Sequence, residues 1–401
     1  MKRSLASLPA AQLDGQRALV RVDFNVPIKD GRISDDTRIR SSLPTIEFAM
    51  AHGATIVLAS HLGRPKGKPS PQLSLRPVAE HLSTLLGKPV GFADDCIGDP
   101  ATMLVDRTYK SGGGIVLLEN LRFHPEEEKN DPAFAKKLAS LADGLYVDDA
   151  FGAAHRAHAS VEGITHFVRQ AAAGLLMEQE LRYLGHALES PERPFVTVLG
   201  GAKVSDKLDV IQNLLGKVDR LLIGGAMAYT FLKSRDVPVG NSLVENDKLD
   251  AARAISADAA RKNVRLELPV DHIVTDRVEE GTANELLDIG DARIGNRLGV
   301  DIGPATIKAY ETFIRAAKTV VWNGPMGVFE IEAFARGTVA VARAVAAVTG
   351  TTIVGGGDSI AAVRKAGVAD RITHISTGGG ASLEFLGGQT LPGVAALADK
   401  P

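Results

Sequence analysis

Short apolar runs rich in β-branched residues alternate with segments of helical periodicity along the whole chain, and this alternation constrains the fold more than any other feature. The strand-like runs are 18–22, 55–59, 115–118, 145–147, 195–199, 220–223, 319–322, 351–354 and 372–375. The helical segments include 37–50, 75–86, 133–141, 206–215 and 247–261. Near-continuous apolar strands that alternate with helices predict parallel sheets covered on both faces. We therefore expect an α/β protein of Rossmann-like three-layer (αβα) domains.

The length of the chain, 401 residues, predicts two domains with large cores. Residues 174–188 carry apolar residues at helical spacing with charges between them, and Pro191 and Pro194 follow. This pattern predicts one long connecting helix that ends before the next strand. The expected organisation is an N-terminal domain over 1–172, a connecting helix and hinge over 173–190, and a C-terminal domain over 191–387.

The composition narrows the class of protein. A formal net charge of −2 argues against a nucleic-acid partner, so an anionic ligand needs a local cluster of positive charge. A single cysteine, Cys96, excludes an internal disulfide framework and favours a reducing compartment. The first residues lack the apolar run of a signal peptide, and no stretch reaches the ~18 apolar residues of a membrane span. We expect a cytoplasmic protein with no membrane partner.

Two glycine-rich segments in the second half indicate phosphate binding. Residues 355–359 read Gly-Gly-Gly-Asp-Ser, and residues 377–380 read Thr-Gly-Gly-Gly. Each follows a strand-like run and precedes a helix-like segment. Bare glycines at a helix start expose backbone N–H groups and the positive end of the helix dipole, which suit phosphate. Because Asp358 also suits Mg²⁺, nucleotide chemistry is the leading hypothesis for this half.

Two further strand ends in the second half carry polar residues. Lys203 and Lys207 follow a Gly-Gly pair, and if Lys203 lies near the first turn of a helix, both ammonium groups face one side. The alternative is that both are solvated surface lysines. Residues 323–330, Asn-Gly-Pro-Met-Gly-Val-Phe-Glu, form another glycine-rich strand end, with an acid that suits ribose hydroxyls.

Four arginines in the first half, Arg38, Arg64, Arg122 and Arg156, lie after strand-like runs or at the start of a helix. The planar guanidinium grips carboxylate or phosphate with two hydrogen bonds. One such arginine is usually solvated or paired with a surface acid. Four at equivalent ends of one sheet indicate a small, highly anionic ligand.

Common cofactor motifs are incomplete. Residues 63–69 echo a phosphate-binding loop, but the spacing is one residue short and Pro69 replaces the required Ser or Thr. No Gly-x-Gly-x-x-Gly follows the first strand of either half, so a dinucleotide is not expected. His155 and His158 are three residues apart, yet no cysteine or acid pattern completes a zinc site with them.

Eight segments, taken together and in order, resemble phosphoglycerate kinase. They are 21–27 (RVDFNVP), 60–65 (SHLGRP), 118–123 (LENLRF), 154–158 (AHRAH), 200–204 (GGAKV), 322–330 (WNGPMGVFE), 355–359 (GGGDS) and 376–382 (STGGGAS). Any one of them could arise by chance, whereas eight in register do not. The match runs from about residue 16 to the C-terminal region.

The resemblance implies a phosphotransferase of glycolysis and gluconeogenesis with a carboxyl group as acceptor. It would interconvert 1,3-bisphosphoglycerate plus MgADP with 3-phosphoglycerate plus MgATP. Members of this family are two-lobed monomers that close about a hinge, with the C-terminal tail, here about 388–401, against the N-terminal lobe. The implied partners are these small molecules, with Mg²⁺ accompanying the nucleotide.

The resemblance also implies roles for single residues. Phosphoglycerate would be bound by Asp23, Phe24, Asn25, Arg38, His61, Leu62, Gly63, Arg64, Arg122 and Arg156. The nucleotide would be bound by Lys207, Gly299, Asn323, Glu330, Gly356, Gly357, Asp358 and Ser359, with Asp358 on the metal. The catalytic groups that meet the transferring phosphoryl group would be Arg38, Lys203 and the backbone N–H of Gly379.

Three positions depart from the pattern of the family. Asp148 stands where Asn is frequent, Ala153 where Thr is common, and Ala305 where Lys is frequent. None of the three is among the catalytic residues that the resemblance implies. Asp148 adds a negative charge near the arginines, so substrate affinity is the property that it puts in doubt.

The implied chemistry fits the residues present. The acceptor is a carboxylate with a pKa near ~4, so it is ionised at neutral pH and direct in-line transfer needs no general base. Positioning and neutralisation of charge remain as the tasks of the protein. A different class stays open, either a module that clamps a phosphorylated metabolite without chemistry or a degenerate enzyme that acts as a scaffold. The two lysines, Asp358 and the glycine loops favour the enzyme.

Overall fold

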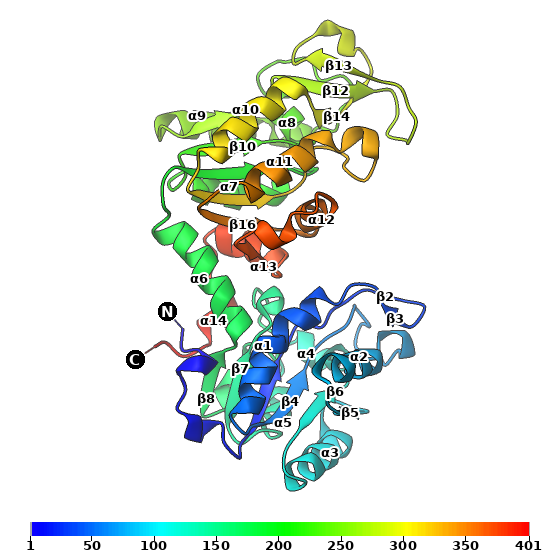
Figure 1. Ribbon diagram of the computed structural model, residues 1–401, viewed down its shortest axis with the longest axis vertical. Helices are drawn as coiled ribbons and strands as arrows, with labels where there is room; N and C mark the ends of the chain where they lie inside the picture. Colours follow the sequence, from blue (N-terminus) through cyan, green and yellow to red (C-terminus); the bar gives the residue numbers. More distant parts are fainter. Residues whose placement is uncertain (1, 401) are drawn as a thin grey trace. The chain divides into compact units, whose positions relative to one another are not determined.

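The computed structural model describes residues 2–400, which form two compact units. The N-terminal unit extends to Arg182 and includes the end of the chain from Thr390 onward, and the C-terminal unit is Tyr183–Gln389. The division between them falls inside helix α6 (Leu175–Glu189). Figure 1 labels the helices and strands of both units.

A six-stranded sheet forms the centre of the N-terminal unit. Its order is β5-β6-β4-β1-β7-β8, and every neighbouring pair is parallel. The strands are β1 (Arg17–Arg21), β4 (Thr55–Ala59), β5 (Val90–Ala93), β6 (Ile115–Leu118), β7 (Leu145–Asp148) and β8 (Gln170–Ala173). The helices that flank it are α1 (Thr37–Ala51), α2 (Arg76–Leu86), α3 (Gly98–Lys110), α4 (Pro125–Glu128) and α5 (Pro132–Ala139). A two-stranded hairpin of β2 (Ile28–Lys29) and β3 (Arg32–Ile33) precedes α1.

A second parallel six-stranded sheet forms the centre of the C-terminal unit, in the order β11-β10-β9-β15-β16-β17. The strands are β9 (Phe195–Leu199), β10 (Arg220–Ile223), β11 (Arg265–Glu267), β15 (Thr319–Asn323), β16 (Thr351–Gly355) and β17 (His374–Ile375). The helices are α7 (Leu208–Leu214), α8 (Met227–Lys233), α9 (Leu249–Arg261), α10 (Pro304–Arg315), α11 (Arg336–Ala346), α12 (Gly357–Lys365) and α13 (Gly380–Leu386). The prediction of α/β units with parallel sheets is confirmed.

The C-terminal unit also contains a small antiparallel sheet that the sequence pattern did not predict. Its order is β13-β12-β14, with strands β12 (Asp271–Thr275), β13 (Asn284–Asp288) and β14 (Leu298–Ile302). Charged or polar residues interrupt the apolar residues of all three strands, mostly exposed in β13 but buried in β12 and β14, so no apolar run marked them.

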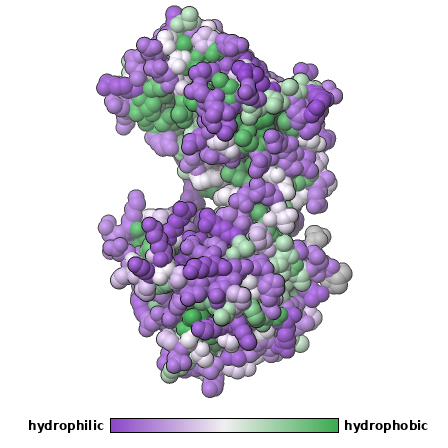
Figure 2. All heavy atoms as spheres, turned by 180° about the vertical axis from the view of Figure 1, so that it is seen from behind, coloured by the Kyte–Doolittle hydropathy of each residue, from purple (hydrophilic) through white to green (hydrophobic). Residues whose placement is uncertain are grey.

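Each central sheet is covered closely by apolar side chains. All five residues of β4 and all five of β15 are buried, as strands between two helical layers must be. Each buried Val, Leu or Ile contributes about 1.5–3 kcal/mol relative to exposure to water. The face of the molecule drawn in Figure 2 is largely hydrophilic, with apolar residues in separate patches. Among the described residues, no helix is both long and apolar enough to cross a bilayer.

The end of the chain is part of the N-terminal unit. The short helix α14 (Pro392–Ala395) follows Thr390, and Gly393 N donates to Ala154 O at 2.8 Å. Farther along, Arg3 N donates to Ala398 O at 2.7 Å, and Ala173 N donates to Arg3 O at 2.8 Å. The first and last described residues thus meet beside β8.

Candidate functional site

The predicted substrate-binding residues lie at the carboxyl ends of strands in the N-terminal unit, with Arg38 in the first turn of α1. Asp23, Phe24 and Asn25 follow β1, the segment His61–Arg64 follows β4, Arg122 lies in the 3₁₀ helix η4 (Leu121–Phe123) after β6, and Arg156 follows β7. Because parallel strands end at one edge of a sheet, this edge is where ligands of α/β proteins bind.

Hydrogen bonds join these loops to one another. Arg38 Nη1 donates to Asp23 Oδ2 at 2.9 Å and to Asn25 O at 3.3 Å. The side-chain oxygen of Asn25 accepts from Gly63 N at 2.9 Å, and Arg122 Nη1 donates to Gly63 O at 2.9 Å. The loops after β1, β4 and β6 therefore form one connected network with the start of α1.

The arginine and histidine side chains at this edge lie close enough for their charges to perturb one another's pKa values, and we call them the basic cluster: Arg21, Arg38, His61, Arg122, Arg156 and His158. Burial lowers the pKa of His61 well below its usual value, and the charges of Arg21, Arg122 and Arg38 lower it further. Burial also lowers the pKa of Arg122, with a further contribution from Arg21 and Arg156. Positive charges held together against their own repulsion create a strong potential for an anion.

Arg21 is a member of the basic cluster that the sequence analysis did not assign. It is fully buried at the end of β1. Its Nε donates to Ser160 Oγ at 2.9 Å, and Ser160 Oγ donates to the buried carboxylate of Glu127 at 2.6 Å. A charged residue at the end of an otherwise apolar strand was the signal that could have identified it, because such a charge must have partners inside the fold.

The contact between Arg21 and His61 fixes the tautomer of the histidine. Arg21 Nη2 lies 3.0 Å from His61 Nδ1. A guanidinium can only donate, so Nδ1 accepts and the ring proton is on Nε2. Because its pKa is lowered, the ring is neutral at physiological pH. His61 therefore offers a ligand one N–H donor, from Nε2.

Three of the predicted substrate-binding residues differ from the rest in how accessible their side chains are. The side chains of Phe24 and Leu62 are buried in the apolar core. Their backbone N–H groups donate to Ser60 Oγ at 2.9 Å and Asn120 Oδ1 at 3.2 Å. Arg64 is exposed and makes no hydrogen bond or ion pair within residues 2–400. Phe24 and Leu62 thus shape the loops, whereas the Arg64 guanidinium is accessible.

Asp148, one of the three departures from the family pattern, is the last residue of β7 and is fully buried. Its Oδ1 accepts from Ala150 N at 2.9 Å, and its Oδ2 has no partner in the described chain. Burial raises the pKa of Asp148 to about 7, while Arg21 opposes that shift. Near neutral pH this carboxyl is therefore only partly ionised, which reduces the negative charge that it adds beside the basic cluster.

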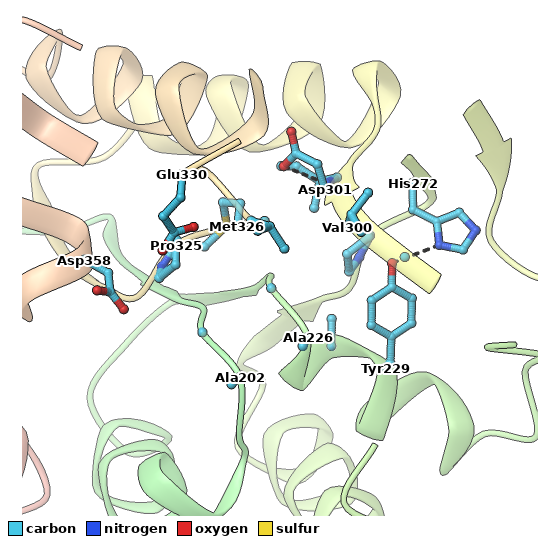
Figure 3. A pocket seen from close by; sticks show the side chains of 18 residues that line it. Ala202, Ala226, Tyr229, His272, Val300, Asp301, Pro325, Met326, Glu330 and Asp358 are labelled. Carbon is cyan, nitrogen blue, oxygen red and sulfur yellow. Dashed lines mark hydrogen bonds between the residues drawn. The ribbon is translucent and has the colours of Figure 1, made fainter. Parts of the chain in front are cut away.

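A cavity of about 270 Å³ lies in the C-terminal unit (Figure 3). Of the predicted nucleotide-binding residues, Gly299, Glu330 and Asp358 line it. In Figure 3, Asp358 and Glu330 lie toward one end, and Tyr229 and His272 toward the other. A pocket with acidic groups at one end and mainly apolar walls matches a ligand with a charged part and a flat apolar part.

Gly299 has no side chain, and this leaves room for the Tyr229 ring in the wall of the cavity. A Cβ at this position would lie 1.6 Å from the hydroxyl oxygen of Tyr229. That hydroxyl is 3.0 Å from His272 Nδ1 (Figure 3). Burial lowers the pKa of His272 to about 4 and raises that of Tyr229, so both are neutral. The sequence analysis missed Tyr229 and His272, although the pair Gly224-Gly225 between β10 and α8 was a signal that could have directed attention to Tyr229.

The other predicted nucleotide-binding residues form a group around Asn323 at the end of β15. Lys207 Nζ donates to Asn323 Oδ1 at 2.7 Å, and Gly324 N donates to Ser359 Oγ at 2.6 Å. Asn323 Nδ2 is buried without a partner in the described chain, and a Cβ on Gly356 would lie 3.0 Å from it. Gly356 has φ of 89°, which favours glycine.

Both glycine-rich segments begin helices, as the sequence predicts. β16 ends at Gly355 and α12 begins at Gly357, so Asp358 lies in the first turn. α13 begins at Gly380, and its N-cap Gly379 has φ of 54°. The backbone N–H groups at these starts are not used within the helices.

The condition under which Lys203 and Lys207 would share one face of a helix, that Lys203 lies near the first turn, is not met. α7 begins only at Leu208, and the preceding residues Ser205–Lys207 form a separate 3₁₀ turn. Lys207 is buried, and its pKa is lowered by burial, whereas Lys203 is exposed. The two ammonium groups therefore have different surroundings, and helical spacing does not relate them.

Comparison with known proteins gives a consistent result over nearly the whole chain. The family model described as phosphoglycerate kinase matches residues 8–389. A protein named phosphoglycerate kinase from Koribacter versatilis is 57% identical over 405 residues, covering 99% of this chain and 100% of the relative. One from Acidobacterium capsulatum is 59% identical over 406 residues, with the same coverage.

Solved structures agree with these relatives. The structure of phosphoglycerate kinase from Coxiella burnetii has a TM-score of 0.87 at 43% identity and covers 99% of this chain and 98% of its own. That from Pyrococcus horikoshii has a TM-score of 0.83 at 34% identity and covers 98% of both chains.

Proposed function

Because the chain belongs to the phosphoglycerate kinase family, we propose that the basic cluster of its N-terminal unit binds phosphoglycerate and that the cavity of its C-terminal unit binds the nucleotide. The protein is a phosphotransferase that interconverts 1,3-bisphosphoglycerate and ADP with 3-phosphoglycerate and ATP in glycolysis, with Mg²⁺ as the cation of the nucleotide. Its partners are these small molecules. The residues that carry this activity are the subject of the proposal.

One observation supports the assignment of the substrate-binding site in the N-terminal unit. We call this site, and the nucleotide-binding site of the C-terminal unit, the two half-sites. Four strand ends and the start of α1 bring the basic cluster to one edge of a sheet, in a chain with a net charge of only −2. A phosphoglycerate carries both a phosphate and a carboxylate, so it suits such a cluster better than a neutral metabolite does. Asp23, Asn25, Arg38, His61, Gly63, Arg64, Arg122 and Arg156 form the proposed contact set, with Phe24 and Leu62 holding the loops in shape.

The C-terminal cavity is proposed to hold the base and ribose near Gly299 and Glu330, with phosphates at the starts of α12 and α13. Lys207, Asn323, Gly356, Gly357 and Ser359 would complete this half-site. The Asp358 carboxylate is exposed in the first turn of α12 and offers the hard oxygen ligand that Mg²⁺ prefers, so the site fits that cation. When bound, Mg²⁺ neutralises phosphate charge.

The proposed mechanism needs no general base. The substrate carboxylate is already ionised at neutral pH, with a pKa near ~4. Arg38, Lys203 and the backbone N–H of Gly379 are proposed to stabilise the phosphoryl group during direct in-line transfer. Arg38 and Lys203 belong to different units. We therefore propose that the units, organised as domains 1–172 and 191–387 about a hinge at 173–190, close to bring both half-sites to one phosphoryl group and exclude water.

A coupled assay of ATP consumption tests the activity. Turnover is expected only when 3-phosphoglycerate, ATP and Mg²⁺ are all present. A protein that binds 3-phosphoglycerate but shows no turnover would be a binding module, contrary to the proposal. We also propose a cytoplasmic monomer, which sedimentation of the purified protein and fractionation of its cells would test.

A further inference from the structure

A second group of ligand atoms lies at the same sheet of the N-terminal unit, outside the proposed substrate and nucleotide sites. Asp95 and Cys96 follow β5, and His124 follows η4, the 3₁₀ helix after β6. β5 and β6 are paired in parallel, with Ala93 opposite Leu118, so both segments leave the same edge. One ligand atom from each of the three side chains lies within 4.8 Å of the others.

The ligand atoms of this group lie close enough to meet around a single ion after shifts of about 1 Å. Zinc holds sulfur, nitrogen and oxygen ligands at about 2.0–2.3 Å, which places ligand atoms roughly 3.3–3.8 Å apart at tetrahedral angles. His124 Nε2 is 2.7 Å from Asp95 Oδ1, so this pair would separate by less than about 1 Å to share an ion. The His124 ring lies 5.3 Å from the ring of Phe134, which supports its position.

The electrostatic surroundings of the sulfur also favour a cation. Asp95 and Glu127 place negative charge near Cys96. This negative charge attracts a divalent ion, and coordination by the sulfur would replace the thiol proton. Glu127 is fully buried, so solvent screens its charge weakly.

A cavity of about 730 Å³ opens beside the group and is lined by Asp95 and His124. Its other charged lining residues are the acids Glu80, Asp94 and Glu119 and the single base Arg76, which pairs with Asp94. Acids therefore outnumber bases along its wall, so the cavity concentrates cations. It also gives a fourth ligand, such as water, access to an ion held by three side chains.

From this geometry we propose that Asp95, Cys96 and His124 form a binding site for one thiophilic divalent cation, with Zn²⁺ as the best match, and with a fourth coordination position open to the cavity. One sulfur, one nitrogen and one oxygen ligand select Zn²⁺ or Co²⁺ over Mg²⁺, which prefers oxygen alone. Three protein ligands with one open position distinguish this arrangement from a closed structural zinc site. Binding converts the thiol and a free ion into a coordinated thiolate and one released proton.

Titration of the chelator-treated full-length protein with Co²⁺, without nucleotide and with excess Mg²⁺, tests this site. Because Cys96 is the only cysteine, a thiolate-to-cobalt absorption band in the near ultraviolet reports this position alone. We expect saturation at one ion per chain, displacement by Zn²⁺, and release of about one proton per ion bound at neutral pH. Absence of the band from the folded wild-type protein at saturating Co²⁺ would overturn the proposal.

Single substitutions identify the side chains that coordinate the ion. Cys96→Ser should abolish the band, and His124→Ala should weaken Zn²⁺ binding by at least about a hundredfold, the upper end for loss of an outer-shell partner. Asp94→Asn is the matched control, because Asp94 lines the same cavity but pairs with Arg76, and it should retain the wild-type affinity within about threefold. Equal Zn²⁺ affinity of His124→Ala and the wild type would reject the assignment. Circular dichroism verifies that each variant is folded, and if Cys96→Ser is not, the wild-type band and His124→Ala decide.

Discussion

At the scale of single residues, Arg21 shows how the N-terminal unit tolerates a cation in its interior. A buried charge is costly unless it is paired and hydrogen-bonded. Arg21 bonds to Ser160 and His61, and the buried carboxylates of Glu127 and Asp148 lie close enough for their pKa values to respond to it. The guanidinium is therefore held in place before any ligand arrives, and it orients His61 with Nε2 as the donor.

Arg38 is the residue whose loss should affect turnover most selectively. Arg38→Ala should lower kcat by about a hundred- to a thousandfold, or about 3–4 kcal/mol of barrier, because it removes one donor to a developing charge. Arg40→Ala is the matched control, since Arg40 lies on the same helix and pairs with Asp36 near the surface. The coupled assay measures both variants. Near-normal turnover of Arg38→Ala, or an equal loss in Arg40→Ala, would contradict the role of Arg38.

Asp148 should make the stability of the protein depend on pH. Its folded pKa of about 7 exceeds the usual unfolded value near ~3.9, so the folded state binds the extra proton between about pH 4 and 7. The contribution of Asp148 to the free energy of unfolding is therefore largest below about pH 4 and falls as the pH rises to about 7. Asp148→Asn removes this loss, so it should stabilise the protein by up to about 4 kcal/mol near pH 8 and progressively less toward pH 5.

Urea unfolding of the wild type and Asp148→Asn across this pH range measures that difference. A stability difference that does not change between pH 5 and 8 would show that ionisation of Asp148 does not oppose folding.

At the scale of elements, β14 packs closely against α8 because Gly299 has no side chain. Gly299→Ala would place a Cβ 1.6 Å from the Tyr229 hydroxyl oxygen, so the wall of the cavity must move. Overpacking of this kind costs typically about 1–3 kcal/mol. We expect weaker ADP binding and a lower Tm, measured by calorimetry and thermal unfolding.

Gly216→Ala is the control for that substitution, because a Cβ there would meet no atom within 4 Å. It should leave ADP affinity unchanged. Unchanged ADP affinity and Tm in Gly299→Ala would show that the cavity wall is not held as the structure indicates.

The predictability of the elements followed their burial pattern. β4, with the sequence Thr-Ile-Val-Leu-Ala, and β15 were predictable because every residue is buried and apolar runs mark such strands. β8, with the sequence Gln-Ala-Ala-Ala, was not, because alanine has no strand preference and the strand forms only against β7. The antiparallel strands β12 to β14 were not predictable for a related reason, since charged and polar residues, buried in β12 and β14 and mostly exposed in β13, break the apolar pattern.

The residues of the candidate site likewise fall into those that the sequence predicts and those that it does not. Asp358 and Gly356 were predictable, because a strand, glycines and a helix start are adjacent in the sequence. Arg21 with Ser160, and Tyr229 with His272, are far apart in the sequence and meet only in the folded units. Such pairs need the tertiary structure, and the register that brings them together has no local signature.

At the scale of the whole molecule, the two proposed half-sites make a prediction about compaction. Because Arg38 and Lys203 belong to different units, the proposed transfer needs groups of both units at one phosphoryl group, and we propose that the units close about it. We expect the radius of gyration from small-angle scattering to fall when 3-phosphoglycerate and the nucleotide are bound together, and less with either ligand alone. An unchanged radius with both ligands bound would argue against closure.

The return of the last residues to the N-terminal unit has a consequence for biosynthesis. Ala398 and Gly393 hold Arg3 and Ala154 through backbone hydrogen bonds, yet the ribosome makes them after the whole C-terminal unit. While translation continues, the N-terminal unit lacks its final segment, whereas the C-terminal unit, which ends at Gln389, needs no later residue. Of the two units, the one that emerges first is thus the one completed last.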